Sequence, residues 1–176
     1  MKIAIVGYSA SGKSTLAAYL GKLCGVPVLH MDTVRFLPGW VERAKEEQVR
    51  IVEDFMNENA ETGWVIDGNY TSIVYERRMQ EADRILFLNF SRLACLHRAR
   101  KRYRTYRGRV RESAAEGCEE KLDREFVRWI LIDGRTRERR ARYTTLGAQY
   151  PEKFTVIKNQ RRLTAYMAEV GRGVTE

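Results

Sequence analysis

The chain has 176 residues, of which 44% are hydrophobic, a size that suits one well-filled core and excludes two full domains. No apolar run reaches the roughly 18 to 20 residues that a membrane span needs, and the first residues lack the pattern of a signal peptide. We therefore expect a single domain over residues 1–176, in a soluble, cytoplasmic protein without a membrane partner.

The net charge of +9 is concentrated in one third of the chain. Residues 91–145 hold 17 lysines and arginines against 8 aspartates and glutamates, and the rest of the chain is balanced at 15 of each. Arginine dominates this segment, and its planar fork suits bidentate contacts with phosphate. The segment either faces an anion or forms a solvated helix surface. The three cysteines, Cys24, Cys95 and Cys118, lack paired spacing and are expected to be free thiols.

The first third of the chain alternates between strand and helix patterns. Residues 2–6 form an unbroken apolar run typical of a strand buried on both faces, and residues 14–25 have helical composition. Residues 26–32 indicate a second strand, followed by a loop over residues 33–40 that is broken by proline and glycine. Apolar positions at helical spacing predict an amphipathic helix over residues 41–61.

The alternation continues to the end of the chain. Residues 63–67 predict a third strand, a short helix follows over about residues 72–81, and residues 84–90 form the most apolar strand. After the arginine-rich segment, the pattern predicts a helix over residues 119–143, a strand over residues 153–158 and a final helix over residues 159–170. This order predicts an α/β fold of three α/β/α layers around a parallel five-stranded sheet.

The segment GYSASGKST lies between the first strand and the first helix, and it has the spacing of a phosphate-binding P-loop. Backbone amides at the helix N-terminus would surround the β-phosphate, Lys13 would reach the β- and γ-oxygens, and Ser14 would bind Mg²⁺. A plain strand-to-helix turn with an exposed lysine is the alternative. The residues predicted to bind the nucleotide are Gly7, Ser9, Ala10, Ser11, Gly12, Lys13, Ser14 and Thr15.

Two further carboxylates follow predicted strands. Asp67 ends the third strand, where a carboxylate can hold Mg²⁺ directly or through water, or alternatively cap the loop. Asp32 ends the second strand, at the sheet edge where ligands of open α/β folds bind. It is either a base for an acceptor hydroxyl or a turn cap. His30 is expected to be buried with one hydrogen bond, and Trp40, Asn69 and Tyr70 are weaker candidates for the same pocket.

The segments GYSASGKST and WVIDGNY together resemble the adenylate-kinase-like small kinases. Together with LHMDTVRFLPGW and LFLNFSRLACLHRARKRY, they resemble more closely, over nearly the whole chain, the bacterial FlaR-related P-loop proteins called DNA topology modulation proteins. The resemblance implies a core over residues 1–90 and 146–170, with an arginine-rich helical lid over about residues 91–145. It implies that lid arginines stabilise the transferred phosphoryl group, with Arg98 and Arg102 one helical turn apart as one candidate set. The second set is Arg139, Arg140 and Arg142.

The sequence departs from adenylate kinases because the arginine-bearing helix for a second nucleotide is not recognisable. The resemblance therefore implies a kinase that uses ATP and Mg²⁺ on a small acceptor of unidentified class, with catalytic residues Lys13, Asp32, Arg98, Arg102 and Arg139. The alternative is a nucleotide-gated, DNA-associated protein in which the arginine-rich segment contacts the phosphate backbone.

Overall fold

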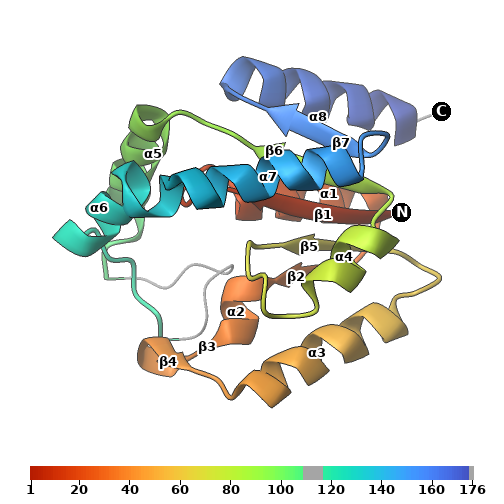
Figure 1. Cartoon of the computed structure of the whole chain (residues 1–176), viewed down its shortest axis with the longest axis horizontal. Helices are drawn as coiled ribbons and strands as arrows, with labels where there is room; N and C mark the ends of the chain where they lie inside the picture. The colour runs from red at the N-terminus through yellow and green to blue at the C-terminus, as the bar shows by residue number, and fades with distance from the viewer. Residues whose placement is uncertain (109–116, 175–176) are drawn as a thin grey trace.

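The strand β1 (Lys2–Gly7) lies at the centre of a sheet of five parallel strands in a computed structural model that describes residues 1–108 and 117–174. The strand order is β2-β5-β1-β6-β7, so β1 pairs with β5 on one side and with β6 on the other (Figure 1). The other strands are β2 (Val28–His30), β5 (Trp64–Asp67), β6 (Arg84–Leu88) and β7 (Phe154–Ile157). The predicted parallel five-stranded sheet is confirmed.

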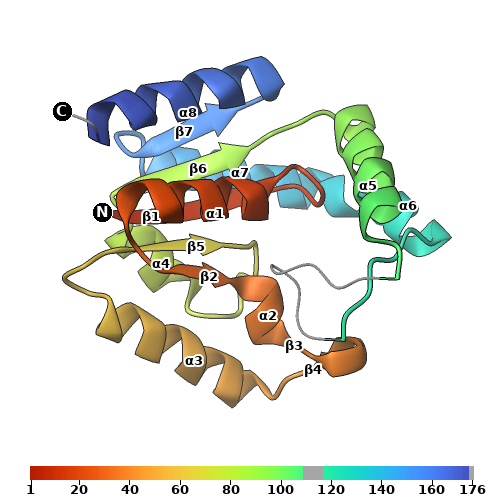
Figure 2. The same cartoon turned by 180° about the vertical axis from the view of Figure 1, so that it is seen from behind.

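Helices cover both faces of this sheet, which confirms the three layers (Figures 1 and 2). The helices α1 (Lys13–Cys24) and α8 (Gln160–Val174) lie on one face, where the Tyr19 hydroxyl donates a hydrogen bond of 3.2 Å to the Met167 carbonyl. The helices α4 (Tyr75–Glu81) and α7 (Arg137–Gln149) lie on the other face. The helix α3 (Lys45–Glu58) lies at the β2 side of the molecule.

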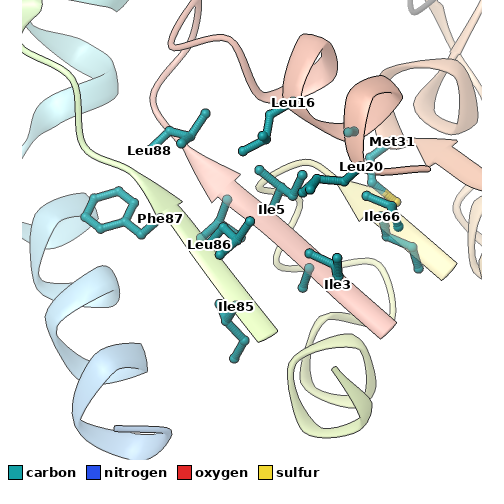
Figure 3. Packing of buried hydrophobic residues seen from close by; sticks show 14 of the residues in the cluster. Ile3, Ile5, Leu16, Leu20, Met31, Ile66, Ile85, Leu86, Phe87 and Leu88 are labelled. Carbon is teal, nitrogen blue, oxygen red and sulfur yellow. The ribbon is translucent and has the colours of Figure 1, made fainter. Parts of the chain in front are cut away.

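The core lies between the sheet and these helices. Leu16 and Leu20 of α1 lie next to Ile5 of β1, and all three side chains are almost fully buried (Figure 3). On the opposite face, Phe87 of β6 stacks on Tyr143 of α7 with ring centroids 4.0 Å apart. Apolar side chains on both faces explain why the strands read as unbroken apolar runs in the sequence.

The predicted second strand and the loop after it required correction. The strand β2 ends at His30, and the next residues form a short helix, α2 (Met31–Arg35). A small antiparallel hairpin follows, formed by β3 (Phe36–Leu37) and β4 (Val41–Glu42) around the 3-10 turn η1 (Pro38–Trp40). The amphipathic helix predicted from residue 41 therefore begins only at Lys45, and the helix predicted from residue 72 begins at Tyr75.

The long helix predicted over residues 119–143 was also wrong, because the structure has two helices there. The helix α6 (Arg124–Leu131) is separated from α7 by the 3-10 turn η2 (Asp133–Arg135). Each helix has its own N-cap: Asp123 accepts a hydrogen bond from the Phe126 amide, and Thr136 accepts one from the Arg139 amide. These caps start two separate helices where apolar spacing alone suggested one.

The helices α5 (Arg92–Tyr106) and α6 lie together at one end of the sheet (Figures 1 and 2). They belong to the predicted lid over residues 91–145, of which residues 109–116 lie outside the described part of the chain. Within residues 1–108 and 117–174, no helix has the length and apolar character to cross a membrane.

Candidate functional site

The P-loop joins β1 to α1 through backbone conformations that favour glycine. Gly7 has φ +146° and Gly12 has φ +99°, both in the region that L residues rarely adopt. A Cβ atom on Gly7 would also lie 2.7 Å from the Leu88 carbonyl oxygen, so the loop can approach β6 only without a side chain. The two glycines explain the spacing that the sequence analysis identified.

Lys13 lies across this loop. Its Nζ donates hydrogen bonds to the carbonyl oxygens of Gly7, at 3.0 Å, and Tyr8, at 3.2 Å. Burial lowers the pKa of the Lys13 ammonium, and the negative charges of Asp67 and Asp32 oppose this shift. A phosphate group would supply both the charge and the acceptor atoms that favour the protonated form.

Ser14 and Asp67 meet at the carboxyl edge of the sheet. The Ser14 hydroxyl donates a hydrogen bond of 2.9 Å to Asp67 Oδ2, and the carboxylate is only 4% exposed. Two hard oxygen ligands at this place fit Mg²⁺, which keeps several waters and takes further ligands from phosphates. The described residues contain no group of three or more His, Cys, Asp or Glu side chains that could hold a metal ion.

His30 contacts the same carboxylate. The register pairs His30 with Asp67, and its Nδ1 lies 2.5 Å from Asp67 Oδ1. The prediction that His30 makes one hydrogen bond agrees with the structure, but the side chain is half-buried and lines the cleft rather than the core. The sequence could not identify its partner, because Asp67 lies 37 residues away.

Asp32 faces the same cleft from the first turn of α2. Its Oδ1 accepts a hydrogen bond of 2.7 Å from the Tyr70 hydroxyl, and both residues line the cleft. Burial and the neighbouring Asp32 charge raise the pKa of Tyr70, so the phenol stays protonated and donates to the carboxylate. Arg35 lies over the Tyr70 ring, with its guanidinium carbon 4.8 Å from the ring centroid.

A buried arginine supports the loop that carries Tyr70. Arg78 is 1% exposed and donates to the carbonyl oxygens of Tyr70, at 2.7 Å, and Gly68, at 3.4 Å. Burial lowers the pKa of Arg78 to about 10. The sequence alone does not indicate that this arginine is internal, because its helix position is also compatible with a solvated surface. Asn69 in the same loop joins β5 to the P-loop, since its Oδ1 accepts from the Gly7 amide at 2.8 Å.

The predicted arginines divide between the cleft and other surroundings. Arg98 and Arg102 both line the cleft, and Arg98 Nη1 donates to the Ser11 carbonyl oxygen in the P-loop at 2.7 Å. Arg102 forms an ion pair of 2.8 Å with Glu120. Arg139 and Arg142 also line the cleft, whereas Arg140 lies in a separate groove and is not part of this site.

Trp129 is a cleft residue that lies within the helix predicted over residues 119–143. Its indole Nε1 donates a hydrogen bond of 2.9 Å to the Ser9 hydroxyl, so α6 touches the P-loop directly. The Arg139 guanidinium lies 4.6 Å from the Trp129 ring. The Trp129 side chain is 36% exposed, whereas its neighbour Ile130 is buried in the core.

These groups surround one cleft with a volume of about 1570 Å³. The P-loop and α5 form one side, and α2, the hairpin and the loop after β5 form another. A site for one drug-sized ligand typically measures about 300 to 1,000 Å³. The cleft therefore has room for a nucleotide and a second small molecule.

No family model matches the sequence, and no curated protein matches it. Solved structures do match over nearly the whole chain. A shikimate kinase from Bacteroides thetaiotaomicron is 14% identical, with a TM-score of 0.53 over 100% of this chain and 99% of that one. A gluconokinase from Sinorhizobium meliloti 1021 is 14% identical, with a TM-score of 0.51 over 99% of this chain and 91% of that one.

A protein from Thermus thermophilus is 17% identical, with a TM-score of 0.55 over 96% of this chain and 97% of that one. At these identities the likeness concerns the fold alone. The chain shares the three-layer α/β/α fold of these solved structures. The closer resemblance to DNA topology modulation proteins stays a prediction.

Proposed function

We propose that this protein transfers the γ-phosphoryl group of ATP to a hydroxyl group of a small molecule. The observation that carries the proposal is that the P-loop and the Asp32–Tyr70 pair face one cleft of about 1570 Å³. One part of the cleft has the features of a phosphate site. The other part offers a carboxylate that can take a proton.

On the nucleotide side, the P-loop amides and Lys13 bind the phosphates, and Arg98 lies beside the loop to contact charge on the transferred group. Ser14 and Asp67 would hold Mg²⁺, which neutralises charge on the phosphate oxygens when it is bound. Arg102 and Arg139 reach the cleft from α5 and α7 and are proposed to approach the phosphates when the cleft closes.

On the acceptor side, Asp32 is proposed to act as the general base. Tyr70 occupies its Oδ1 oxygen, which leaves Oδ2 to accept the proton of the acceptor hydroxyl. The hydroxyl oxygen forms a bond to the γ-phosphorus, and the bond from that phosphorus to the β,γ-bridging oxygen breaks. ADP leaves with the bridging oxygen and its electron pair.

The structural similarity to a shikimate kinase and a gluconokinase supports this proposal, since both act on small hydroxylated molecules. The alternative is a DNA-associated protein, as the resemblance to DNA topology modulation proteins would suggest. Its support is a row of exposed basic side chains on α5, among them Arg100, Lys101 and Arg104. Binding of this kind would weaken steeply as salt increases.

ADP formation from magnesium ATP separates the two functions. The wild type and Lys13→Ala are compared with a panel of small hydroxylated acceptors and, in parallel, with duplex DNA. Stimulation by one class of small acceptor, lost in Lys13→Ala, supports the kinase. Equal rates with every small acceptor, together with stimulation by DNA that falls with salt, would contradict it. The variant Lys22→Ala, at the far end of α1, is the control for loss of one lysine.

A further inference from the structure

Arg35 has hydrogen-bonding capacity that the protein itself does not use. Among the described residues, only its Nη2 has an acceptor, the exposed carboxylate of Glu42 at 3.2 Å. Its Nε is buried and has no partner within the described part of the chain. Buried donors without a partner are uncommon, and a bound ligand is one of the ways in which they become satisfied.

Trp40, in the hairpin next to α2, shows the same pattern. Its indole Nε1 is buried and unpartnered among the described residues, and Trp40 lines the cleft together with Arg35. Its backbone φ of +66° is unusual for a residue with a side chain. Two donors without acceptors therefore lie in the wall that also carries Asp32.

Tyr70 fixes the position of Arg35 relative to Asp32. Its hydroxyl donates to the Asp32 carboxylate at 2.7 Å, and its ring lies under the Arg35 guanidinium at 4.8 Å. Tyr70 thus holds the Asp32 carboxylate near its hydroxyl group and the Arg35 guanidinium over its ring. A single small molecule can contact both groups at once.

The basic side chains of the cleft place one cation on the acceptor side. Among the described residues, Asp32 and Asp67 are the carboxylates that line the cleft, and magnesium ATP would add a net charge of about −2 at the P-loop. The basic side chains in this lining are Lys13, Arg35, Arg98, Lys101, Arg102, Arg139 and Arg142, of which Arg35, Arg102 and Arg142 also pair with Glu42, Glu120 and Glu138. Arg35 is the one of them on the Asp32 side, in α2, and so its charge is not needed for the nucleotide.

We propose that the acceptor is a hydroxylated anion, whose hydroxyl group lies at Asp32 and whose carboxylate or phosphate group is bound by the Arg35 guanidinium. This inference rests on the proposed function and names the substrate class of the same site. Carboxylate and phosphate share the chemistry that matters here, because either oxyanion accepts paired hydrogen bonds from a guanidinium. A neutral polyol would offer the Arg35 guanidinium no negative charge beyond that of the exposed Glu42 carboxylate.

Matched probes test the anion directly. Aldonates from glycerate to gluconate are compared with the alditols of equal length and with the corresponding alditol phosphates. Each probe is measured as a phosphoryl acceptor with magnesium ATP, and by calorimetry for binding to the protein with magnesium ADP. We expect one anionic series to bind at least about 10-fold more tightly than the alditols. Whether the aldonates or the alditol phosphates prevail identifies the source of the anion.

Substitutions at Arg35 test the residue. Arg35→Gln should weaken binding of the preferred anion about 10- to 100-fold, and leave alditol and ADP binding unchanged, because a charged hydrogen bond is lost. Arg35→Lys should restore part of the loss. Glu42→Gln, which removes only the exposed partner of Arg35, should not weaken anion binding, and Arg50→Gln removes an exposed charge on α3 away from the cleft.

The outcomes separate this inference from the proposed function. Anion binding that depends on Arg35, without phosphoryl transfer to any probe, would overturn the kinase proposal and leave the anion site standing. Phosphorylation of alditols as efficient as that of the anions would overturn the inference and leave the kinase standing. Equal binding of all three series, or anion binding unaffected in a folded Arg35→Gln variant, would also overturn the inference.

Discussion

Ser14 and Asp67 are 53 positions apart in the sequence, yet the Ser14 hydroxyl donates a hydrogen bond of 2.9 Å to Asp67 Oδ2. Ser14 belongs to the first turn of α1, and Asp67 is the last residue of β5, the strand beside β1. The parallel arrangement brings the two residues to the same sheet edge. This contact is the structural basis for the Mg²⁺ site in the proposed reaction.

The Asp67→Asn variant tests this site. The amide keeps the shape of the side chain but loses the negative charge, so we expect half-maximal ADP formation to need about 10-fold more Mg²⁺ and turnover to fall by a similar factor or more. A magnesium titration of the rate measures both effects. Asp54→Asn, an exposed position on α3, is the matched control. An unchanged magnesium dependence in Asp67→Asn would remove Asp67 from the metal site.

Alanine substitutions at two glycines with left-handed backbones should distinguish an effect on nucleotide binding from an effect on stability. Gly12 has φ +99° and Gly25 has φ +66°, so alanine at either position should cost about 1 to 2 kcal/mol of unfolding free energy. At Gly12 the new Cβ would lie 2.6 Å from Arg98 Nη1, whereas at Gly25 it would meet no atom of the described residues within 4 Å.

We therefore expect Gly12→Ala to weaken ADP binding by about 10-fold or more and Gly25→Ala to leave it unchanged. Chemical denaturation and calorimetry measure the two quantities separately. If Gly12→Ala bound ADP as well as Gly25→Ala did, the P-loop geometry would not be required for nucleotide binding.

The sequence was sufficient to predict the sheet and the P-loop because both depend on local patterns. Apolar runs mark the strands, and the spacing of Gly7, Gly12 and Lys13 marks the loop. The caps at Asp123 and Thr136 are local signals too, but the continuous apolar spacing around them outweighed them. They divide one predicted helix into two.

The wall of the cleft could not be predicted in the same way, because its contacts join distant segments. Tyr70 meets Asp32 across 38 positions, and Trp129 meets Ser9 across 120. No periodicity in either segment specifies such a partner. Charge did not identify the cleft residues either. Arg98 lines the cleft and Arg140 does not, although both lie in the same arginine-rich segment.

The protonation of Lys13 predicts a pH dependence of nucleotide binding. Burial lowers the pKa of this ammonium, and only the charged form binds phosphate well, so affinity for ADP should decline as pH rises, at lower pH than for an unperturbed lysine. Lys13→Arg should bind with a flatter profile, because a guanidinium stays charged. Calorimetry from about pH 7 to about pH 10 measures both proteins. Equal slopes would show that Lys13 does not titrate in this range.

The lowered pKa of Lys13 makes stability increase with pH, whereas it makes the affinity for ADP decline. The folded chain binds the Lys13 proton less tightly than the unfolded chain does, so the contribution of Lys13 to the free energy of unfolding increases as pH rises through its lowered pKa. In the absence of nucleotide, the wild type should therefore gain stability relative to Lys13→Met over this range. Urea unfolding at several pH values measures the difference, and a constant difference would contradict the shift.

The contact between Trp129 and Ser9 predicts an optical signal for nucleotide binding. The chain has three tryptophans; Trp64 is fully buried, while Trp40 and Trp129 line the cleft. Phosphates that enter the P-loop will alter the surroundings of the Trp129 indole, so magnesium ADP should change its fluorescence. We expect the change to persist in Trp40→Phe and to disappear in Trp129→Phe. The reverse pattern would show that α6 does not respond to the nucleotide.

The central claim is phosphoryl transfer to an acceptor at Asp32, and the most direct measurement follows a label from ATP to that acceptor. Wild type and Asp32→Asn are incubated with ATP labelled at the γ-phosphate and the anionic acceptor panel, and the products are separated from inorganic phosphate. We expect labelled acceptor from the wild type, a rate at least about 100-fold lower in Asp32→Asn, and ADP binding unchanged in the variant. Label found only in inorganic phosphate, or equal transfer by both proteins, would contradict it.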